Sequence, residues 1–298
     1  MRTMKVRASR ADRLMSLVNA AFCALAIIVC LYPFYYVVIN SISDPSASAN
    51  TFLLPVRPTL TTYIKLFEEN NIPRAFAVSL LRTFATTVIN VLCSSFLAYL
   101  FTKDMALKKT VYRLVIVTMY LNAGLIPWYL TMKSYGLKNT FLLYVLPYML
   151  SAYYIILIKT FMEQLPDSLG ESAELDGAGS LTIFWRIVFP LSRPILATIA
   201  VFCSVSQWNT WQDNYFLVQS DSLQTIQLIL YNYLNRARAI AQAIMNNPNA
   251  NMGLMDAAVS EKSVRMTIVV VSVIPIMCVY PFLQRYFTKG ILLGAVKG

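Results

Sequence analysis

The sequence predicts an all-α, polytopic integral membrane protein with six transmembrane helices and a helical loop on the cytoplasmic side. The chain of 298 residues is 57% hydrophobic and only 13% charged, with a mean hydropathy of +0.57. Soluble domains are about 25% charged, so this composition excludes a water-soluble protein. Six apolar segments also reach the roughly 20 residues that a helix needs to cross a bilayer.

The predicted crossings are separated by polar or turn-rich connections, and they are 17–41, 77–102, 112–133, 140–161, 194–216 and 265–287. An even number of crossings places both termini on one side. We divide the chain into 1–76 (tail, first helix and outer loop), a core at 77–287 and a C-terminal tail at 288–298. The core includes a polar loop at 166–194 and a longer outer loop at 217–264.

The first crossing could instead be a secretory signal peptide, because basic residues precede it and Ala47-Ser48-Ala49 resembles a cleavage site. However, its apolar run of about 25 residues exceeds the usual 7–15 residues of such peptides. Tyr32, Tyr35 and Tyr36 end the run like an interfacial aromatic belt. We therefore expect a retained membrane anchor.

The positions of Lys and Arg predict the orientation, because cytoplasmic loops are enriched in both. With the N-terminus in the cytoplasm, 15 of the 25 basic residues fall on inner segments, which are shorter in total. This assignment makes both termini and the 166–194 loop cytoplasmic. A basic inner rim facing anionic lipid accounts for the net charge of +11, so no nucleic-acid partner is expected.

Other residue types restrict the chemistry of the chain. The cysteines lie in apolar runs without metal-ligand spacing, at Cys23, Cys30, Cys93, Cys203 and Cys278. The sequence has no histidine and no Walker A motif, so the chain itself is not expected to bind ATP, a metal or a cofactor. We predict no catalytic residue, and energy for any transport must come from a partner.

The 166–194 loop is predicted to form a helix, a sharp bend and a second helix. Pro166 ends the preceding helix, and Ser168 with Glu171 fits a capping box for a helix that runs to about Asp176. Gly177 suits a left-handed C-cap.

In the second helix, Ser180 is the expected cap and Pro190 the expected end. One apolar stripe is expected from residues at i, i+3, i+4 and i+7, namely Leu181, Phe184, Trp185 and Val188. An interfacial helix resting on lipid would also show such a stripe.

The spacing of this loop is more specific than its composition. Gly177 follows Glu171 by six residues, Ile187 follows Gly177 by ten, and Pro190 comes three later. This pattern resembles the EAA loop of ABC importer permeases, with Ser172 and Phe189 as mild departures. The resemblance implies that the loop couples the permease to an ATPase, through Glu171, Ser172, Ala173, Asp176, Gly177, Ala178, Ile187 and Pro190.

Further segments resemble the carbohydrate branch of these permeases, similar to the maltose type: 137–140, 207–209, 284–290 and 294–298. The outer loop and tail are most similar to permeases for alginate and pectin oligosaccharides. The resemblance implies a bacterial inner membrane location and three kinds of partner. These are a second homologous permease, two cytoplasmic ATPase subunits that bind ATP and Mg²⁺, and an extracytoplasmic solute-binding protein.

A solute path is predicted where polar side chains reach membrane depth in the fifth segment. At 1.5 Å per residue, Gln207 lies about 20 Å from the inner boundary, in the outer half of the membrane. The candidates are Gln207, Trp208, Asn209, Trp211 and Gln212, with Asn122, Tyr144 and Tyr148 from neighbouring segments. Amides at this depth are expected to face a wet cavity, although interhelical packing is the alternative. Arg82 is expected to snorkel outward.

Two other function classes are compatible with a membrane chain. An integral membrane enzyme needs a cluster of reactive groups at one depth, and we find neither His nor a carboxylate in mid-span. A secondary transporter usually shows intramembrane acids and an internal repeat, which we do not find. A permease for another solute class also stays open.

Overall fold

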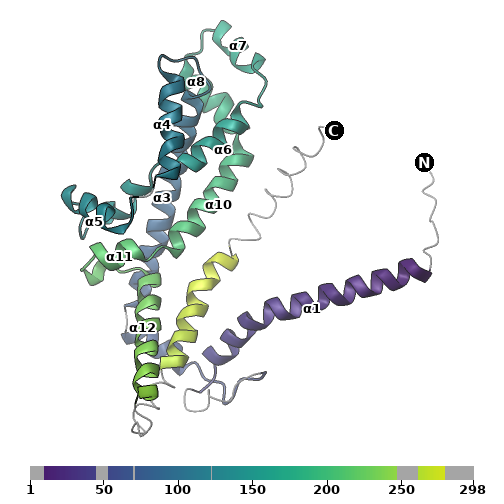
Figure 1. The fold of residues 1–298 in the computed structure, drawn as a ribbon, viewed down its shortest axis with the longest axis vertical. Coiled ribbons are helices and arrows are strands. Elements are labelled where there is room, and N and C mark those ends of the chain that lie inside the picture. The colour runs from purple at the N-terminus through teal and green to yellow at the C-terminus, as the bar shows by residue number, and fades with distance from the viewer. Residues whose placement is uncertain (1–9, 45–52, 70, 122, 247–260, 279–298) are drawn as a thin grey trace. The chain divides into compact units, whose positions relative to one another are not determined.

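The computed structural model describes residues 10–44, 53–69, 71–121, 123–246 and 261–278, and every regular element in these ranges is a helix. The chain divides into two compact units, 1–66 with 233–271 and 67–232 with 272–298. The all-α class predicted from the sequence is therefore confirmed. Figure 1 shows the elements in chain order.

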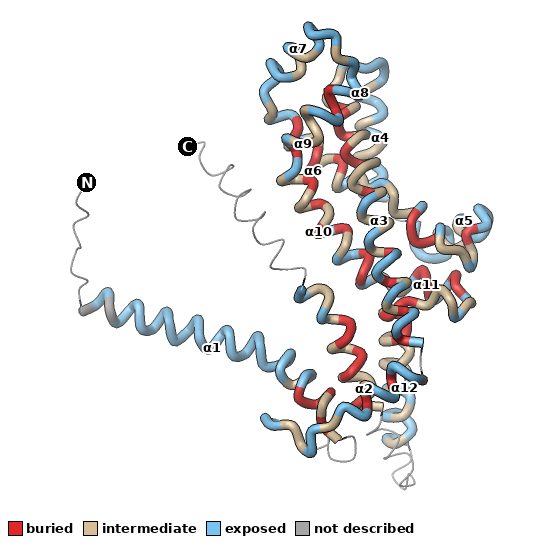
Figure 2. Tube along the Cα trace, turned by 180° about the vertical axis from the view of Figure 1, so that it is seen from behind, coloured by how far each residue is buried: buried red, intermediate tan, exposed pale blue. Residues whose placement is uncertain are grey.

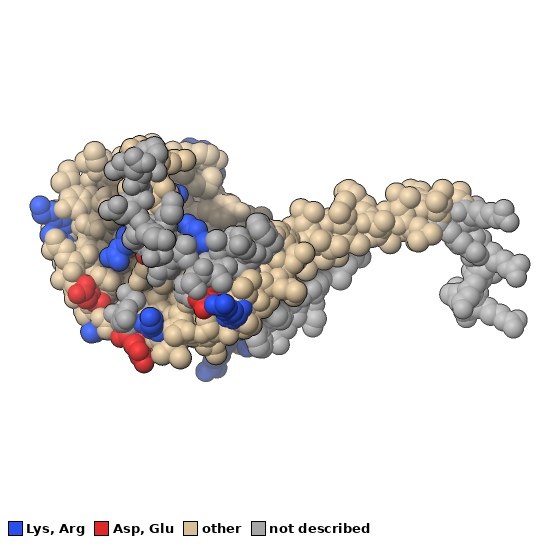
Figure 3. All heavy atoms as spheres, turned by 90° about the horizontal axis from the view of Figure 1, so that it is seen from below, with Lys and Arg blue, Asp and Glu red and all other residues tan. Residues whose placement is uncertain are grey.

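In the first unit, α1 (Arg10–Ser41) is long enough and apolar enough to cross a membrane between Leu14 and Ser41. The most apolar window of this stretch has a mean hydropathy of 2.5, and none of it is buried. Figure 2 accordingly colours α1 as exposed over most of its length, and Figure 3 shows its surface largely free of charged atoms. An apolar, uncharged surface of this length fits contact with lipid, as the first predicted crossing requires.

The rest of the first unit comprises the start of α2 (Thr61–Glu69), most of α12 (Ile226–Asn246) and part of a helix at 261–278. The sixth predicted crossing, 265–287, matches this last helix only up to residue 278. Its remainder, and the tail at 288–298, lie outside the described residues.

The second unit contains the second predicted crossing as an unbroken helix. This helix, α3 (Ile72–Leu100), begins five residues earlier than expected, with Pro73 in its first turn. Proline is tolerated there because the first N–H groups of a helix have no intrahelical partner.

The third, fourth and fifth predicted crossings are each interrupted within their length. The third consists of α4 (Lys108–Tyr120) and α5 (Leu125–Ser134), bent by 120°. Gly124 before α5 has φ +82°, which glycine adopts at little steric cost.

The fourth crossing begins with two 3₁₀ turns, η2 (Phe141–Tyr144) and η3 (Leu146–Tyr148), and continues as α6 (Ala152–Met162) after a 47° bend. The fifth comprises α10 (Arg193–Asn209) and α11 (Gln212–Leu217), joined through η5 (Asp221–Leu223) to α12. Within the described residues, two helices qualify as crossings alone, and up to five qualify if bent pairs count as one.

The core of the second unit lies where α3, α6 and α10 pack against one another, and Figure 2 shows buried stretches on these helices. Its fully buried side chains include Tyr99, Phe101, Ile158, Phe184 and Ile199. Phe184 belongs to the predicted coupling loop, so that loop is anchored in the core of the helix bundle.

Candidate coupling loop and buried polar network

The first helix of the loop, α7 (Ser168–Leu175), agrees closely with the predicted extent. The predicted capping box is wrong, because no side chain caps the helix. Instead the carbonyl of Asp167 accepts from the N–H groups of Gly170 and Glu171, at 2.9 and 3.1 Å. The preceding turn thus supplies the first backbone bonds.

Gly177 ends α7 in the left-handed conformation, as predicted, with φ +81°. Its N–H donates to the carbonyl of Glu174 at 3.0 Å, and the N–H of Ala178 donates to Ala173 at 2.9 Å. This pair of bonds is a Schellman motif, which satisfies carbonyls left free at the helix end. The bend is therefore built by backbone geometry that depends on glycine.

The second helix of the loop is composite: α8 (Ser180–Ile183), a π-helical turn η4 (Phe184–Val188) and α9 (Phe189–Leu191). Ser180 is not its cap, since Gly179 holds that position and no side chain bonds there. Pro190 does not end the helix either. Because Pro190 has no N–H, the ladder is disturbed before it, and the N–H of Phe189 reaches back to Phe184. The helix ends at Leu191, and α10 follows after a 78° bend.

The π turn divides the predicted stripe, because Phe184 is buried and Val188 packs half-buried against the core while the other two residues stay exposed. Ile183 and Phe184 are buried, whereas Leu181 and Trp185 are 60% and 50% exposed. The Phe184 ring contacts the rings of Phe96, Tyr99, Trp185 and Phe189 at centroid distances of 4.9–5.6 Å. A regular 3.6-residue period does not hold across a π turn.

The residues assigned to ATPase coupling lie on the two sides of the bend. Glu171, Ser172, Asp176 and Gly177 are exposed. The other four are half-buried: Ala173, Ala178, Ile187 and Pro190. Figure 2 shows α7 as largely exposed at one end of its unit.

Leu175, next to the bend, is 90% exposed and is not among the predicted coupling residues. An exposed leucine beside polar side chains offers apolar area to a partner. A leucine in the last turn before a bend glycine is the signal that could have identified it.

Two contacts join the loop to the end of α3. Lys103 forms an ion pair with Glu174 at 2.7 Å, and the Tyr99 hydroxyl donates to the carbonyl of Ser180 at 3.1 Å. The hydrogen bond to Glu174 raises the pKa of Lys103. Both partners of the ion pair are partly exposed, so we assign it no more than about 1 kcal/mol.

A hollow of about 700 Å³ separates α7 from the helices behind it. It is lined by apolar residues, including Met162, Ile183 and Ile187, and by charged residues, namely Lys103, Asp104, Glu163, Asp167, Glu171 and Glu174. α7 therefore stands away from the bundle rather than packing flat on it.

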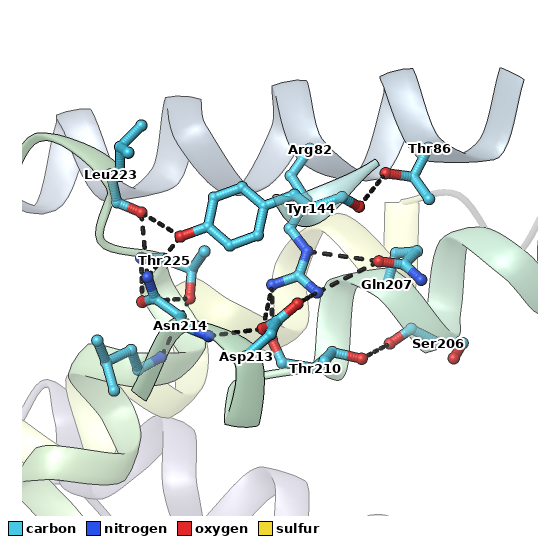
Figure 4. Close-up of polar contacts among 11 residues, drawn as sticks. Arg82, Thr86, Tyr144, Ser206, Gln207, Thr210, Asp213, Asn214, Leu223 and Thr225 are labelled. Carbon is cyan, nitrogen blue, oxygen red and sulfur yellow. Dashed lines mark hydrogen bonds and ion pairs between the residues drawn. The ribbon is translucent and has the colours of Figure 1, made fainter. Parts of the chain in front are cut away.

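A second polar feature, the Arg82 network, lies at the other end of α10 and is drawn in Figure 4. Arg82, on α3, is 1% exposed. Its guanidinium donates to both carboxylate oxygens of Asp213 at 3.1 and 2.6 Å, to the Gln207 amide oxygen at 3.3–3.4 Å and to the Thr210 carbonyl at 3.2 Å. The Tyr144 ring lies 4.6 Å from the same guanidinium. Arg82 thus joins α3 to both sides of the α10–α11 break.

Asn214 extends this network on the side of α11. Its amide nitrogen donates to the Tyr144 hydroxyl and to the Leu223 carbonyl, and its amide oxygen accepts from the N–H and hydroxyl of Thr225. The Tyr144 hydroxyl donates to the same Leu223 carbonyl at 2.7 Å. These bonds hold the α11–α12 connection against η2.

This network corrects one sequence interpretation and adds a residue that was not selected. Arg82 does not snorkel outward, because Asp213 neutralises its charge inside the protein. Asp213 falls near the outer end of the predicted fifth crossing, and its pairing with Arg82 was not predicted. One Arg and one Asp in two separate apolar segments are the signal that could have suggested a buried pair.

The structure places the predicted path residues in three different settings. Gln207, Trp208 and Tyr144 are buried, and the Trp208 ring nitrogen donates to the Ser272 carbonyl at 2.9 Å. The prediction that Gln207 faces a wet cavity is therefore wrong, because Arg82 occupies its amide oxygen.

Asn209 and Gln212 are exposed, and Trp211 is half-buried and stacked on Tyr231 at 3.8 Å. Tyr148 is half-buried, and its carbonyl accepts from Asn90 at 2.7 Å. Asn122 lies outside the described residues.

Comparison with known proteins identifies the family. Residues 90–293 match the model of the binding-protein-dependent transport system inner membrane component. The chain belongs to this family. As an inner membrane component, the permease is a multi-pass protein of a bacterial inner membrane and has a transport role.

The permease is 33% identical to the polygalacturonan/rhamnogalacturonan transport system permease protein YtcP of Bacillus subtilis, over 96% of this chain and 99% of that protein. It is 31% identical to protein LplC of the same organism, over 97% of each. A solved bacterial ABC transporter involved in import of the acidic polysaccharide alginate matches with a TM-score of 0.82 at 28% identity, covering 95% of this chain and 100% of that one. The ABC permease fold inferred from the loop is confirmed by these comparisons.

Proposed function

We propose that this permease forms, together with a second homologous permease, the path by which an ATP-driven importer carries a carbohydrate across the membrane. The observation that carries this proposal is the helix, glycine bend and helix at 168–191, in a chain that is 33% identical to a polygalacturonan permease. Two cytoplasmic ATPase subunits supply ATP and Mg²⁺ binding, and an extracytoplasmic binding protein delivers the solute.

The exposed surface of α7 is the part that docks on an ATPase subunit. Leu175 supplies apolar area, and Glu171, Ser172 and Asp176 supply polar contacts around it. Movement of the ATPase then reaches α10 through η4 and α9, which precede it in the chain and are separated from it by one residue and a 78° bend.

The solute is an acidic oligosaccharide, such as a fragment of a uronic acid polymer. Polygalacturonan and alginate, named for two similar proteins, are both of this kind. Arg236 and Arg238 are exposed on α12, in the predicted outer loop, and Arg236 lies over the Tyr233 ring at 5.5 Å. Cationic side chains there would favour approach of a carboxylated sugar.

The test uses the complete importer reconstituted in lipid with its binding protein. We expect an oligogalacturonate or an alginate oligosaccharide to stimulate ATP hydrolysis and uptake several-fold, and neutral raffinose to stimulate neither. If raffinose stimulated hydrolysis and uptake and the acidic sugars did not, the proposal that the solute is acidic would be contradicted. If uptake proceeded without ATP, or if no sugar were transported, the proposal of an ATP-driven carbohydrate importer would be contradicted.

The orientation of the chain is tested by cysteine labelling in a variant without the native cysteines. Cysteines placed at Met105 and Leu175 are expected to be protected from an impermeant thiol reagent in intact cells. Cysteines at Asn50 and Met245 are expected to react. Labelling at 175 from outside would reverse the proposed topology, and lysed cells provide the control for accessibility.

Asn209 and Gln212 are the amides that remain candidates for solute contact. Asn209→Ala and Gln212→Ala are each expected to leave assembly and basal ATP hydrolysis intact and to lower sugar-stimulated transport several-fold. A lost hydrogen bond between exposed groups contributes about 0.5–1.5 kcal/mol, which sets this scale. Gln219→Ala, at another exposed glutamine, is the control. Loss of thermal stability with normal transport per complex would instead favour packing.

A further inference from the structure

α10 connects the two polar features of the second unit. At one end it continues from α9 after the 78° bend, and at the other it ends at Asn209, beside the Arg82 network. Its 17 residues span about 24 Å at 1.5 Å per residue. Figure 1 shows α7 and α11 near opposite ends of this helix. When the coupling loop displaces α10, the α10–α11 break at the other end of the helix moves with it.

Arg82 determines how this break is held. The last carbonyls of a helix lack intrahelical partners, and Arg82 supplies a donor to one of them, Thr210. The same guanidinium binds Gln207 before the break and Asp213 after it. One planar group thus binds three residues, one on α10, one in the break and one on α11.

The helix positioned in this way carries exposed groups. On α11, Gln212 is exposed, and Tyr215 and Phe216 are 47% and 39% exposed. Trp211 in the break stacks on Tyr231, and the Tyr215 ring packs edge-on against both rings. An amide beside an aromatic cluster suits hydrogen bonding and ring stacking with a sugar.

We propose that Arg82 is a positioning residue for transport, which locks α11 to the outer end of α10 and to α3 so that coupling-loop movement reaches the solute-facing side chains of α11. This inference rests on the proposed function of the loop and of α11. It assigns Arg82, Asp213 and Gln207 no direct contact with the solute.

The fork geometry of arginine separates this role from simple charge neutralisation. A lysine at position 82 would keep a cation next to Asp213, yet a single ammonium cannot reproduce the planar bonds to Gln207 and Thr210. Methionine at position 207 would preserve side-chain volume and remove one acceptor. Replacing Arg82 with glutamine and Asp213 with asparagine together would remove both charges, so neither would be left buried without a partner.

The experiment compares Arg82→Lys, Gln207→Met and the double variant Arg82→Gln/Asp213→Asn in the reconstituted importer. Sugar transported per ATP hydrolysed is measured beside the melting temperature of each complex. We expect assembled complexes with basal hydrolysis near that of the wild type, and sugar transported per ATP reduced at least threefold in Arg82→Lys and in the double variant. Gln207→Met is expected to show a smaller reduction in the same direction.

Unchanged transport per ATP in the assembled variants would overturn the proposal. It would also be overturned if Arg82→Lys and the double variant failed to assemble while Gln207→Met stayed fully coupled, because the network would then only hold the fold. The coupling-loop proposal is tested separately by Gly177→Val. If that proposal is wrong, Gly177→Val leaves transport coupled to ATP hydrolysis.

Discussion

Gly177→Val is expected to abolish coupled transport while the permease still inserts and folds. At φ +81° a β-branched side chain is strained, and a left-handed residue other than glycine costs about 1–2 kcal/mol. An added Cβ at Gly177 meets no atom within 4 Å, so the strain comes from the backbone and not from a clash. Relaxing that strain would break the bonds from Gly177 and Ala178 and redirect α7.

The measurement is sugar uptake and sugar-stimulated ATP hydrolysis by the purified importer. We expect hydrolysis to become independent of sugar, or the ATPase subunits to be lost during purification. Gly179→Ala is the matched control, since a Cβ there also meets open space and its φ is −70°. Normal uptake and stimulation in Gly177→Val would refute the coupling role of the bend.

Asp213→Ala is expected to be the most destabilising single change in the described part of the permease. It would leave the Arg82 guanidinium buried without its counter-charge, and breaking a buried pair in this way costs about 3–5 kcal/mol. Asp213 also accepts the N–H of Asn214 at 2.7 Å, so the first turn of α11 loses a second bond.

The thermal midpoint of the assembled complex in detergent measures this effect. The control is Asp221→Ala, because Asp221 is exposed and, among the described contacts, its carboxylate accepts only from the side chain of nearby Gln224. Surface changes of that kind stay within about 0.5 kcal/mol. An unchanged midpoint in Asp213→Ala would show that the pair contributes nothing to stability.

Local signals in the sequence were sufficient for the parts of the fold that depend on neighbouring residues. The extent of α7 and the left-handed Gly177 were predicted from residues within one or two turns. The apolar lengths of α1 and α3 were predicted because they depend on composition alone. Predictions that required a regular period failed at the π turn beside Pro190, where the buried face changes.

Hydropathy and motif spacing are properties of short segments. They were therefore enough to predict a membrane protein, a glycine bend within 166–194 and the resemblance to an ABC importer permease. Which polar side chains face one another depends instead on how distant helices pack. Arg82 and Asp213 are 131 residues apart, so neither hydropathy nor local spacing could reveal their pairing. The packing of α3 against α10 brings Gln207 within reach of the buried Arg82 guanidinium, whereas Asn209 and Gln212 lie at the surface, and no local pattern distinguishes these three amides.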